Sequence, residues 1–295
     1  MTAGNDQTEP KRSTRAASQQ AFQAVVTPVS AVATLDPIVQ SFLDRRMERP
    51  EDSRARPSFG DGAETVCFRP FQGTAICPVL IYLHVNNDGH SEMFQALANS
   101  AHVTILSQRI EPKQGLSGAD DAILAQLDAI ADPKHGLDPA HVALGGDDLG
   151  ALAALSFASG PHITRAKLAL LIMATPVLGP PEHANQAPWP TPQRVAHAQD
   201  TAAGWMQEGG WRGELPAERL KHLPPTLLIT AEIDPFRDGA ERLARRMMGA
   251  ERDLSAIRML GTIHDFTVLP DLFDSRATQD AHALMVRALR RHLFD

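Results

Sequence analysis

The sequence predicts an α/β protein with a mainly parallel central sheet covered by helices on both faces. Short apolar runs alternate with segments whose apolar residues recur at helical spacing, which is the order produced by strands joined through crossover helices. Residues 79–84 (Val-Leu-Ile-Tyr-Leu-His) are almost continuously apolar, as is typical of a strand buried on both faces. With 295 residues, 43% of them hydrophobic, the chain is long enough to bury such a core.

The expected elements follow one another from residue 35 to the C-terminus. The first helix begins where Asp36 can cap it and Pro37 suits the first helical position, and a loop at 50–62 follows. Strands are expected at 64–68, 79–84, 102–106, 141–144, 168–173, 226–230 and 256–260. Further helices are expected at 119–131, 151–157 and 279–293.

Changes in composition indicate the domain organisation. Residues 1–20 are polar, mixed in charge and without period, which predicts a disordered tail. We expect residues 21–295 to form one domain. Its cap is expected from residues of about 21–60 and from 179–223, a segment rich in Pro, Gly, Trp and His.

Charge and composition narrow the possible partners. The net charge of −7 argues against a nucleic-acid partner. No apolar run approaches the roughly 20 residues that span a bilayer, and the N-terminus lacks a secretory apolar region, so we expect no membrane partner and a cytoplasmic location. Cys67 and Cys77 suit neither a metal site nor a disulfide framework, and we expect both to be buried thiols.

A sharp turn at residues 144–151 is the feature around which the chain is organised. Gly146 and Gly150 bracket Asp148 between an apolar run and an Ala-rich segment, which is the Gly-x-nucleophile-x-Gly spacing of a nucleophile elbow. Small neighbours allow the chain to pass close by while the central residue adopts a strained conformation. We therefore expect the Asp148 side chain to project at the carboxyl end of the sheet, beside a helix N-terminus.

Five stretches in a fixed order carry a family resemblance. They are residues 78–84 (Pro-Val-Leu-Ile-Tyr-Leu-His), 107–112 (Ser-Gln-Arg-Ile-Glu-Pro), 145–150 (Gly-Gly-Asp-Asp-Leu-Gly), 223–226 with 234–238 (Leu-Pro-Pro-Thr and Asp-Pro-Phe-Arg-Asp) and 261–266 (Gly-Thr-Ile-His-Asp-Phe). Together they resemble the hormone-sensitive-lipase-like esterases of the α/β-hydrolase fold, from about residue 35 to the C-terminus. The resemblance implies that fold, with a small cap.

Two stretches depart from the family pattern where the family does its chemistry. The elbow carries Asp148 where the family has serine, and the family's His-Gly-Gly-Gly is replaced by residues 84–87, His-Val-Asn-Asn. A carboxylate that attacks an acyl carbon gives an anhydride rather than a stable ester. We therefore do not expect ordinary ester hydrolysis.

Asp234 and His264 match the family's triad acid and histidine, and each follows a predicted strand. Asp234 would orient and charge-stabilise His264, which would act as the base. The order nucleophile, acid, histidine fits this fold. The alternative is that Asp234 caps a helix beginning at Pro235 and that His264 is a hydrogen-bonded loop residue.

Asp148 leaves three functions open. As a nucleophile, it would attack a saturated carbon and form an aspartyl ester that His264-activated water hydrolyses, as in haloalkane dehalogenases and epoxide hydrolases. It could instead be a general acid or base in a lyase, isomerase or cyclase. In the third case the site is catalytically dead, the chain is a binding protein, and Asp148 is an anion at a helix N-terminus, worth about 0.3–1 kcal/mol.

Neighbouring residues have expected roles around these three. The backbone N–H of Leu149 would donate a hydrogen bond to an oxyanion. His84 would orient the loop after its strand. Asn86 and Asn87 either supply side-chain amide donors or form a plain polar loop. In the cap segment, Trp189, Trp205 and Trp211 either line a substrate pocket or form the core of the cap. No cofactor or metal is implied. We expect a small-molecule substrate, and a homodimer is left open.

Overall fold

The computed structural model describes residues 34–48, 65–71, 76–85, 90–162, 167–182 and 187–294. The expected tail at 1–20, the loop at 50–62, most of the first cap segment, and both Asn86 and Asn87 lie outside these residues. The unit described below is Leu35–Asp295. Within its described residues, no helix is both long and apolar enough to cross a membrane.

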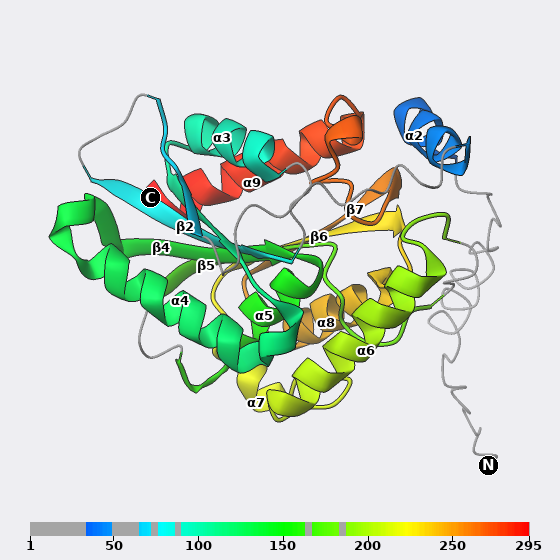
Figure 1. The fold of residues 1–295 in the computed structure, drawn as a ribbon. Coiled ribbons are helices and arrows are strands. Elements are labelled where there is room, and N and C mark those ends of the chain that lie inside the picture. The colour runs from blue at the N-terminus through cyan, green and yellow to red at the C-terminus, as the bar shows by residue number, and fades with distance from the viewer. Residues whose placement is uncertain are drawn as a thin grey trace, which may run out of the picture. The chain divides into compact units, whose positions relative to one another are not determined.

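Helices and strands alternate along the unit (Figure 1). In chain order they are α2 (Pro37–Glu48), β1 (Thr65–Phe68), β2 (Cys77–His84), α3 (His90–Ala101), β3 (Thr104–Arg109), the short 3-10 helix η2 (Pro112–Gln114), α4 (Gly115–Ala131), η3 (Pro133–His135), β4 (Leu137–Asp147), α5 (Asp148–Ser159), β5 (Leu168–Ala174), α6 (Pro192–Glu208), α7 (Ala217–Leu220), β6 (Thr226–Ile233), α8 (Arg237–Gly249), β7 (Leu254–Ile263), η5 (Pro270–Leu272) and α9 (Arg276–Phe294).

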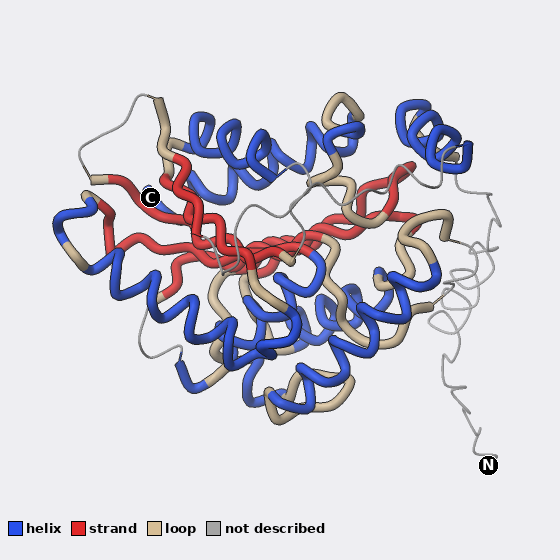
Figure 2. The backbone as a smooth tube through the Cα atoms, in the orientation of Figure 1, coloured by secondary structure: helices blue, strands red, loops and turns tan. Residues whose placement is uncertain are grey.

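The described strands form one seven-stranded sheet in the order β1-β3-β2-β4-β5-β6-β7, drawn red in Figure 2. β1 pairs with β3 in antiparallel fashion, and every other neighbouring pair is parallel. This confirms the mainly parallel sheet. Because parallel strands end at the same edge, β2, β4, β6 and β7 bring His84, Asp147, Ile233 and Ile263 to one side of the sheet.

The two faces of the sheet carry separate apolar cores. On β2, Ile81 belongs to the core with helices α4, α5, α6 and α8, whereas the next residue, Tyr82, belongs to the core with α2, α3 and α9. Figure 1 shows the same division, with α3 and α9 above the sheet and α4, α5 and α8 below it. All eight residues of β2 are buried, as its continuous apolar pattern predicted.

Several elements differ from the expected ones, and tertiary contacts explain two of the differences. Helix α4 begins four residues before residue 119, because the Glu208 carboxylate of α6 accepts hydrogen bonds from the first-turn amides of Leu116 and Ser117 at 2.9 and 2.8 Å. Helices α3, α6, α7 and α8 were not predicted. Cys67 was expected to be buried but is exposed, because β1 is an edge strand with one partner in the sheet.

The segment 179–223 contains α6 and α7. Trp205 and Trp211 are 4% and 5% exposed and belong to the core formed with α4 and α5. The Trp205 indole donates a hydrogen bond to the carbonyl oxygen of Pro112 at 3.3 Å. These contacts favour the second expectation for the two tryptophans, a packing role. That the segment acts as a cap stays a prediction.

Candidate active site

Close backbone packing creates the elbow at Asp148. This residue has a φ of +48°, between the end of β4 and the start of α5. A Cβ atom on Gly150 would lie 2.1 Å from the carbonyl oxygen of Leu83, and one on Gly146 would lie 2.5 Å from the carbonyl carbon of Gly150. Neither position tolerates a side chain without a backbone shift. The two glycines therefore allow α5 to start against β2 with Asp148 at its first position.

The structure brings Asp148, His264 and Asp234 together. Nδ1 of His264 lies 3.0 Å from Oδ2 of Asp234, and Nε2 lies 3.8 Å from Oδ1 of Asp148. All three residues are buried, and His264 is 1% exposed. The same Oδ1 of Asp148 is buried and accepts no hydrogen bond from any described residue. Among the described residues, the nearest positively charged partner of this oxygen is the imidazole of His264.

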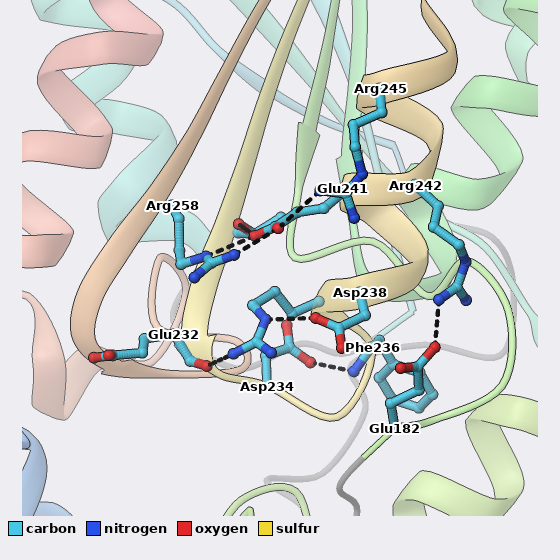
Figure 3. Close-up of polar contacts among 11 residues, drawn as sticks. Glu182, Glu232, Asp234, Phe236, Asp238, Glu241, Arg242, Arg245 and Arg258 are labelled. Atoms are coloured by element: carbon cyan, nitrogen blue, oxygen red, sulfur yellow. Dashed lines mark hydrogen bonds and ion pairs between the residues drawn. The ribbon is translucent and has the colours of Figure 1, made fainter. Parts of the chain in front are cut away.

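Asp234 contacts both its own turn and His264, but it does not cap a helix beginning at Pro235, because α8 begins at Arg237 and its N-cap residue is Phe236. Oδ1 of Asp234 accepts a hydrogen bond from the backbone N–H of Phe236 at 2.8 Å, while Oδ2 contacts His264. Figure 3 shows Asp234 among polar contacts that join the end of β6 to the start of α8. Nearby, the Arg258 guanidinium on β7 binds Glu241 of α8 at 2.7 and 2.6 Å. The Asp234 carboxylate is therefore fixed by its own turn before it orients the imidazole.

A third carboxylate, Asp265, adjoins the same imidazole. Its Oδ1 lies 3.2 Å from Nε2 of His264, and its Oδ2 lies 3.3 Å from the guanidinium of Arg194 on α6. Asp265 is 3% exposed and has a φ of +63°, a backbone region in which Asp and Asn are enriched. The sequence analysis did not assign it a role, because adjacency to His264 does not say which ring nitrogen a side chain faces.

These charges control the protonation of His264. Burial alone would lower the pKa of its imidazole. The negative charges of Asp234 and Asp265 raise it, as do contacts with Asp148 and Asp234, and together these effects outweigh burial. The pKa of His264 therefore lies well above the ordinary value for histidine, which favours the imidazolium among these carboxylates.

The same atoms define a possible metal position. Asp148, His264 and Asp265 each offer one ligand atom, and these atoms lie within 4.8 Å of one another. A ligating imidazole nitrogen carries no proton, so a metal ion and a proton would compete for Nε2 of His264. Without a metal ion, the three side chains form a cluster of ion pairs.

The other predicted site residues lie around this cluster. Leu149 is in the first turn of α5, where backbone N–H groups have no acceptor within the helix. Its N–H is therefore free to donate a hydrogen bond to an oxyanion. Nε2 of His84 lies 2.8 Å from Oγ of Ser107, and its ring stacks on His90 at 4.3 Å. His84 thus binds β3 by its side chain, while the loop that it was expected to orient lies outside the described residues.

Asp147 has partners of its own beneath the elbow. Its Oδ2 lies 2.7 Å from Nε2 of His90 and accepts a hydrogen bond from the Tyr82 hydroxyl at 3.4 Å. Burial, together with the Asp147 charge, raises the pKa of Tyr82 well above its ordinary value, so the phenol stays protonated. These contacts agree with the structural role expected for Asp147.

Fold and site together define an α/β protein with a nucleophile elbow and an acid–histidine pair at the carboxyl edge of its sheet. A model of the alpha/beta hydrolase fold family matches residues 81–268. The chain belongs to this family. This confirms the family expected from the five sequence stretches, while the role of Asp148 stays a proposal.

Comparison with individual proteins gives the same fold. Carboxyl esterase 2 of the fungus Tuber melanosporum has a TM-score of 0.73 at 18% identity, covering 88% of this chain and 100% of that chain. A thermostable esterase from Pseudomonas putida ECU1011 has a TM-score of 0.73 at 21% identity, covering 88% and 98%. Because both identities are low, these likenesses concern the fold.

Two curated relatives match over shorter stretches. An alpha/beta hydrolase of Acanthamoeba polyphaga mimivirus is 39% identical over 72 residues, or 24% of this chain and 21% of that protein. An arylesterase of Saccharolobus solfataricus is 34% identical over 80 residues, or 27% and 24%. The matched region thus spans less than a quarter of either relative.

Proposed function

We propose that this chain is a hydrolase of small organic substrates in which Asp148 is the nucleophile. The observation that carries the proposal is the buried Oδ1 of Asp148, which has no hydrogen-bond partner among the described residues and faces the His264–Asp234 pair at 3.8 Å. Relatives named as esterases support hydrolysis as the reaction class. The carboxylate at the elbow favours a saturated carbon as its target.

In the first step, Oδ1 of Asp148 attacks a saturated carbon that carries a leaving group such as halide. A carbon–oxygen bond forms, the leaving group departs with its bonding electrons, and an aspartyl ester results. This step needs no base, so an imidazolium at His264 does not impede it. The positive charge also favours departure of an anion.

In the second step, water attacks the carbonyl carbon of the ester. His264 must now be neutral to accept a proton from the water, and the N–H of Leu149 stabilises the oxyanion. Esterification removes the charge of Asp148 and with it one contact that raises the pKa of His264. Collapse of the tetrahedral intermediate releases the alcohol and regenerates the carboxylate, so that overall the substrate and water give an alcohol, a proton and the leaving anion.

A second candidate is general acid–base catalysis without a covalent intermediate, as in a lyase or cyclase. The observation that favours it is the position of Nε2 of His264 between two carboxylates, 3.8 Å from Oδ1 of Asp148 and 3.2 Å from Oδ1 of Asp265. In this case Asp148 and His264 exchange a proton with the substrate, and no bond forms between the protein and carbon.

Mass spectrometry of Asp148-containing peptides separates the two candidates. The His264→Gln variant is incubated with a panel of short haloalkanes, haloacids and esters, in a Cys67→Ser background because Cys67 is an exposed thiol that alkylating substrates modify. We expect a substrate-derived mass on Asp148 and none in the matched Asp148→Asn variant, since an amide is a poor nucleophile. Wild-type turnover of a panel member without any adduct in His264→Gln would contradict the covalent mechanism.

A further inference from the structure

We propose that the substrate of this site carries an anionic group, such as a carboxylate, that is bound by Arg194, Arg46 and the indole N–H of Trp189. The inference rests on the proposed function, because it places this group beside Asp148. Arg46 comes from α2 and Arg194 from α6, while Trp189 lies three residues before α6 begins. Sequence analysis assigned no role to the two arginines.

Trp189 joins two cations in one place. The Arg194 guanidinium carbon lies 5.1 Å from the Trp189 ring centroid, and that of Arg46 lies 5.6 Å from it. Phe42 packs edge-on against the same indole at 5.5 Å. Cation–π contacts hold guanidinium groups over a ring without using their N–H donors, so both arginines are oriented while their hydrogen-bonding capacity is retained.

The charges of the two arginines are incompletely balanced. Arg194 pairs with Asp265 through one nitrogen, Nη2, at 3.3 Å, although a guanidinium has five N–H donors. Arg46 makes no ion pair with any carboxylate of the described residues. Arg194 also stands in the first turn of α6, where the helix dipole disfavours a cation and favours an anion. These features leave donors and positive charge for one more anion.

The indole supplies an independent sign of a missing acceptor. Nε1 of Trp189 is buried and has no hydrogen-bond partner among the described residues. A buried donor left unpaired is costly, and buried polar groups in native proteins are nearly always bonded. A carboxylate oxygen is the acceptor that would satisfy this N–H and the guanidinium donors together.

The position of these donors matches the reaction site. Arg194 contacts Asp265, which contacts Nε2 of His264 at 3.2 Å. Nε2 in turn lies 3.8 Å from Oδ1 of Asp148. Arg194 is thus linked to the proposed nucleophile through Asp265 and His264, and we place the anionic group of the substrate on the Asp265 side of the reaction site. A neutral molecule of the same size gains none of the charge-assisted bonds.

The test compares propionate with propionamide, which have nearly the same size and differ in charge. Binding is followed by NMR through the indole N–H signal of Trp189, assigned by its loss in Trp189→Phe. We expect a saturable shift with propionate and none with propionamide. Arg194→Gln and Arg46→Gln should each weaken propionate binding by about tenfold or more. Equal effects of the two probes, or no saturable shift, would overturn the proposal.

Three controls make the result specific. Arg245→Gln removes an arginine on α8 that pairs with Glu241 (Figure 3), and it should leave propionate binding unchanged. Arg194→Lys keeps the charge but loses the planar fork, so it should bind propionate more weakly than the wild type and more strongly than Arg194→Gln. Asp148→Asn should still bind propionate. Binding retained there while no adduct forms on Asp148 in the His264→Gln experiment would reject the nucleophile and keep the anion site.

Discussion

Oδ1 of Asp265 lies closer to Nε2 of His264, at 3.2 Å, than Oδ1 of Asp148 does, at 3.8 Å. The nitrogen that must accept a proton in the proposed second step is therefore shared by two carboxylates before any substrate arrives. Asp265 has a partner of opposite charge in Arg194. It thus couples the protonation of the imidazole to the arginine on α6.

Replacing Asp265 by Asn should lower the pKa of His264, because the Asp265 charge is one of the effects that raise it. Asn also tolerates the φ of +63° at this position, so the backbone should keep its conformation. The pKa can be measured by NMR titration of the imidazole C–H signals. Asp200→Asn, an exposed change on α6, is the matched control and should leave the pKa unaltered. An unchanged pKa in Asp265→Asn would contradict the charge cluster.

The folded protein should lose stability as the pH rises through the alkaline range, in proportion to the raised pKa of His264. A group whose pKa is higher in the folded than in the unfolded state stabilises the fold while it is protonated. Its contribution is fully present below the unfolded pKa, about 6.5 for histidine, and disappears as the pH rises through the folded pKa. Each unit of difference corresponds to about 1.4 kcal/mol.

Urea unfolding of the wild type and His264→Gln over a series of pH values measures this contribution. The free energy of unfolding should fall more steeply above neutral pH in the wild type than in the variant, which has no group to titrate at this position. Parallel curves would show that the imidazole is not held protonated by its neighbours.

Gly150→Ala should destabilise the protein and impair the site, since the added Cβ would lie 2.1 Å from the carbonyl oxygen of Leu83 and backbone must move. Overpacking of this kind costs about 1–3 kcal/mol. Gly204→Ala, within α6 and with no atom within 4 Å of the added Cβ, is the control. It should be neutral or stabilising by about 0.5–1 kcal/mol. Thermal unfolding of both variants compares them directly, and equal melting temperatures would contradict the close approach.

The sequence predicted those parts of the molecule that follow from local pattern. Continuous apolar runs located the strands, and the small residues around Asp148 located the elbow, because only glycine permits the approach to Leu83 that the structure shows. The pairing of Asp234 with His264 followed from chain order and the family resemblance. Each of these inferences needs little knowledge of which side chains meet in space.

Contacts between side chains that are far apart in the sequence could not be predicted from its local pattern. The Glu208 carboxylate starts α4 from another helix, across 92 and 91 residues of chain from its two amide partners. Arg194 and Asp265 are separated by 71 residues, so neither the arginine nor the third carboxylate could be placed at the site. All three tryptophans lie in the segment 179–223, and the sequence does not distinguish their roles. In the structure, Trp205 and Trp211 are buried in the core, whereas Trp189 stacks with the two arginines.

The final prediction concerns the pH at which a covalent intermediate accumulates in the wild type. Formation of the aspartyl ester needs ionised Asp148 and no base, whereas its hydrolysis needs neutral His264, whose pKa is raised by Asp234 and Asp265. Around neutral pH, the first step should therefore proceed while the second is slow. Above neutral pH the imidazole loses its proton and the second step should accelerate.

Rapid quenching followed by mass spectrometry, with a panel member that the wild type turns over, measures the modified fraction of Asp148. We expect this fraction to be largest around neutral pH, where Asp148 is ionised, and to fall as the pH rises further, together with an increase in steady-state turnover. Asp265→Asn should shift both curves toward lower pH, since it lowers the pKa of the same base, whereas Asp200→Asn should shift neither. A modified fraction that stays constant across the pH range would contradict the assignment of His264 as the base of the second step.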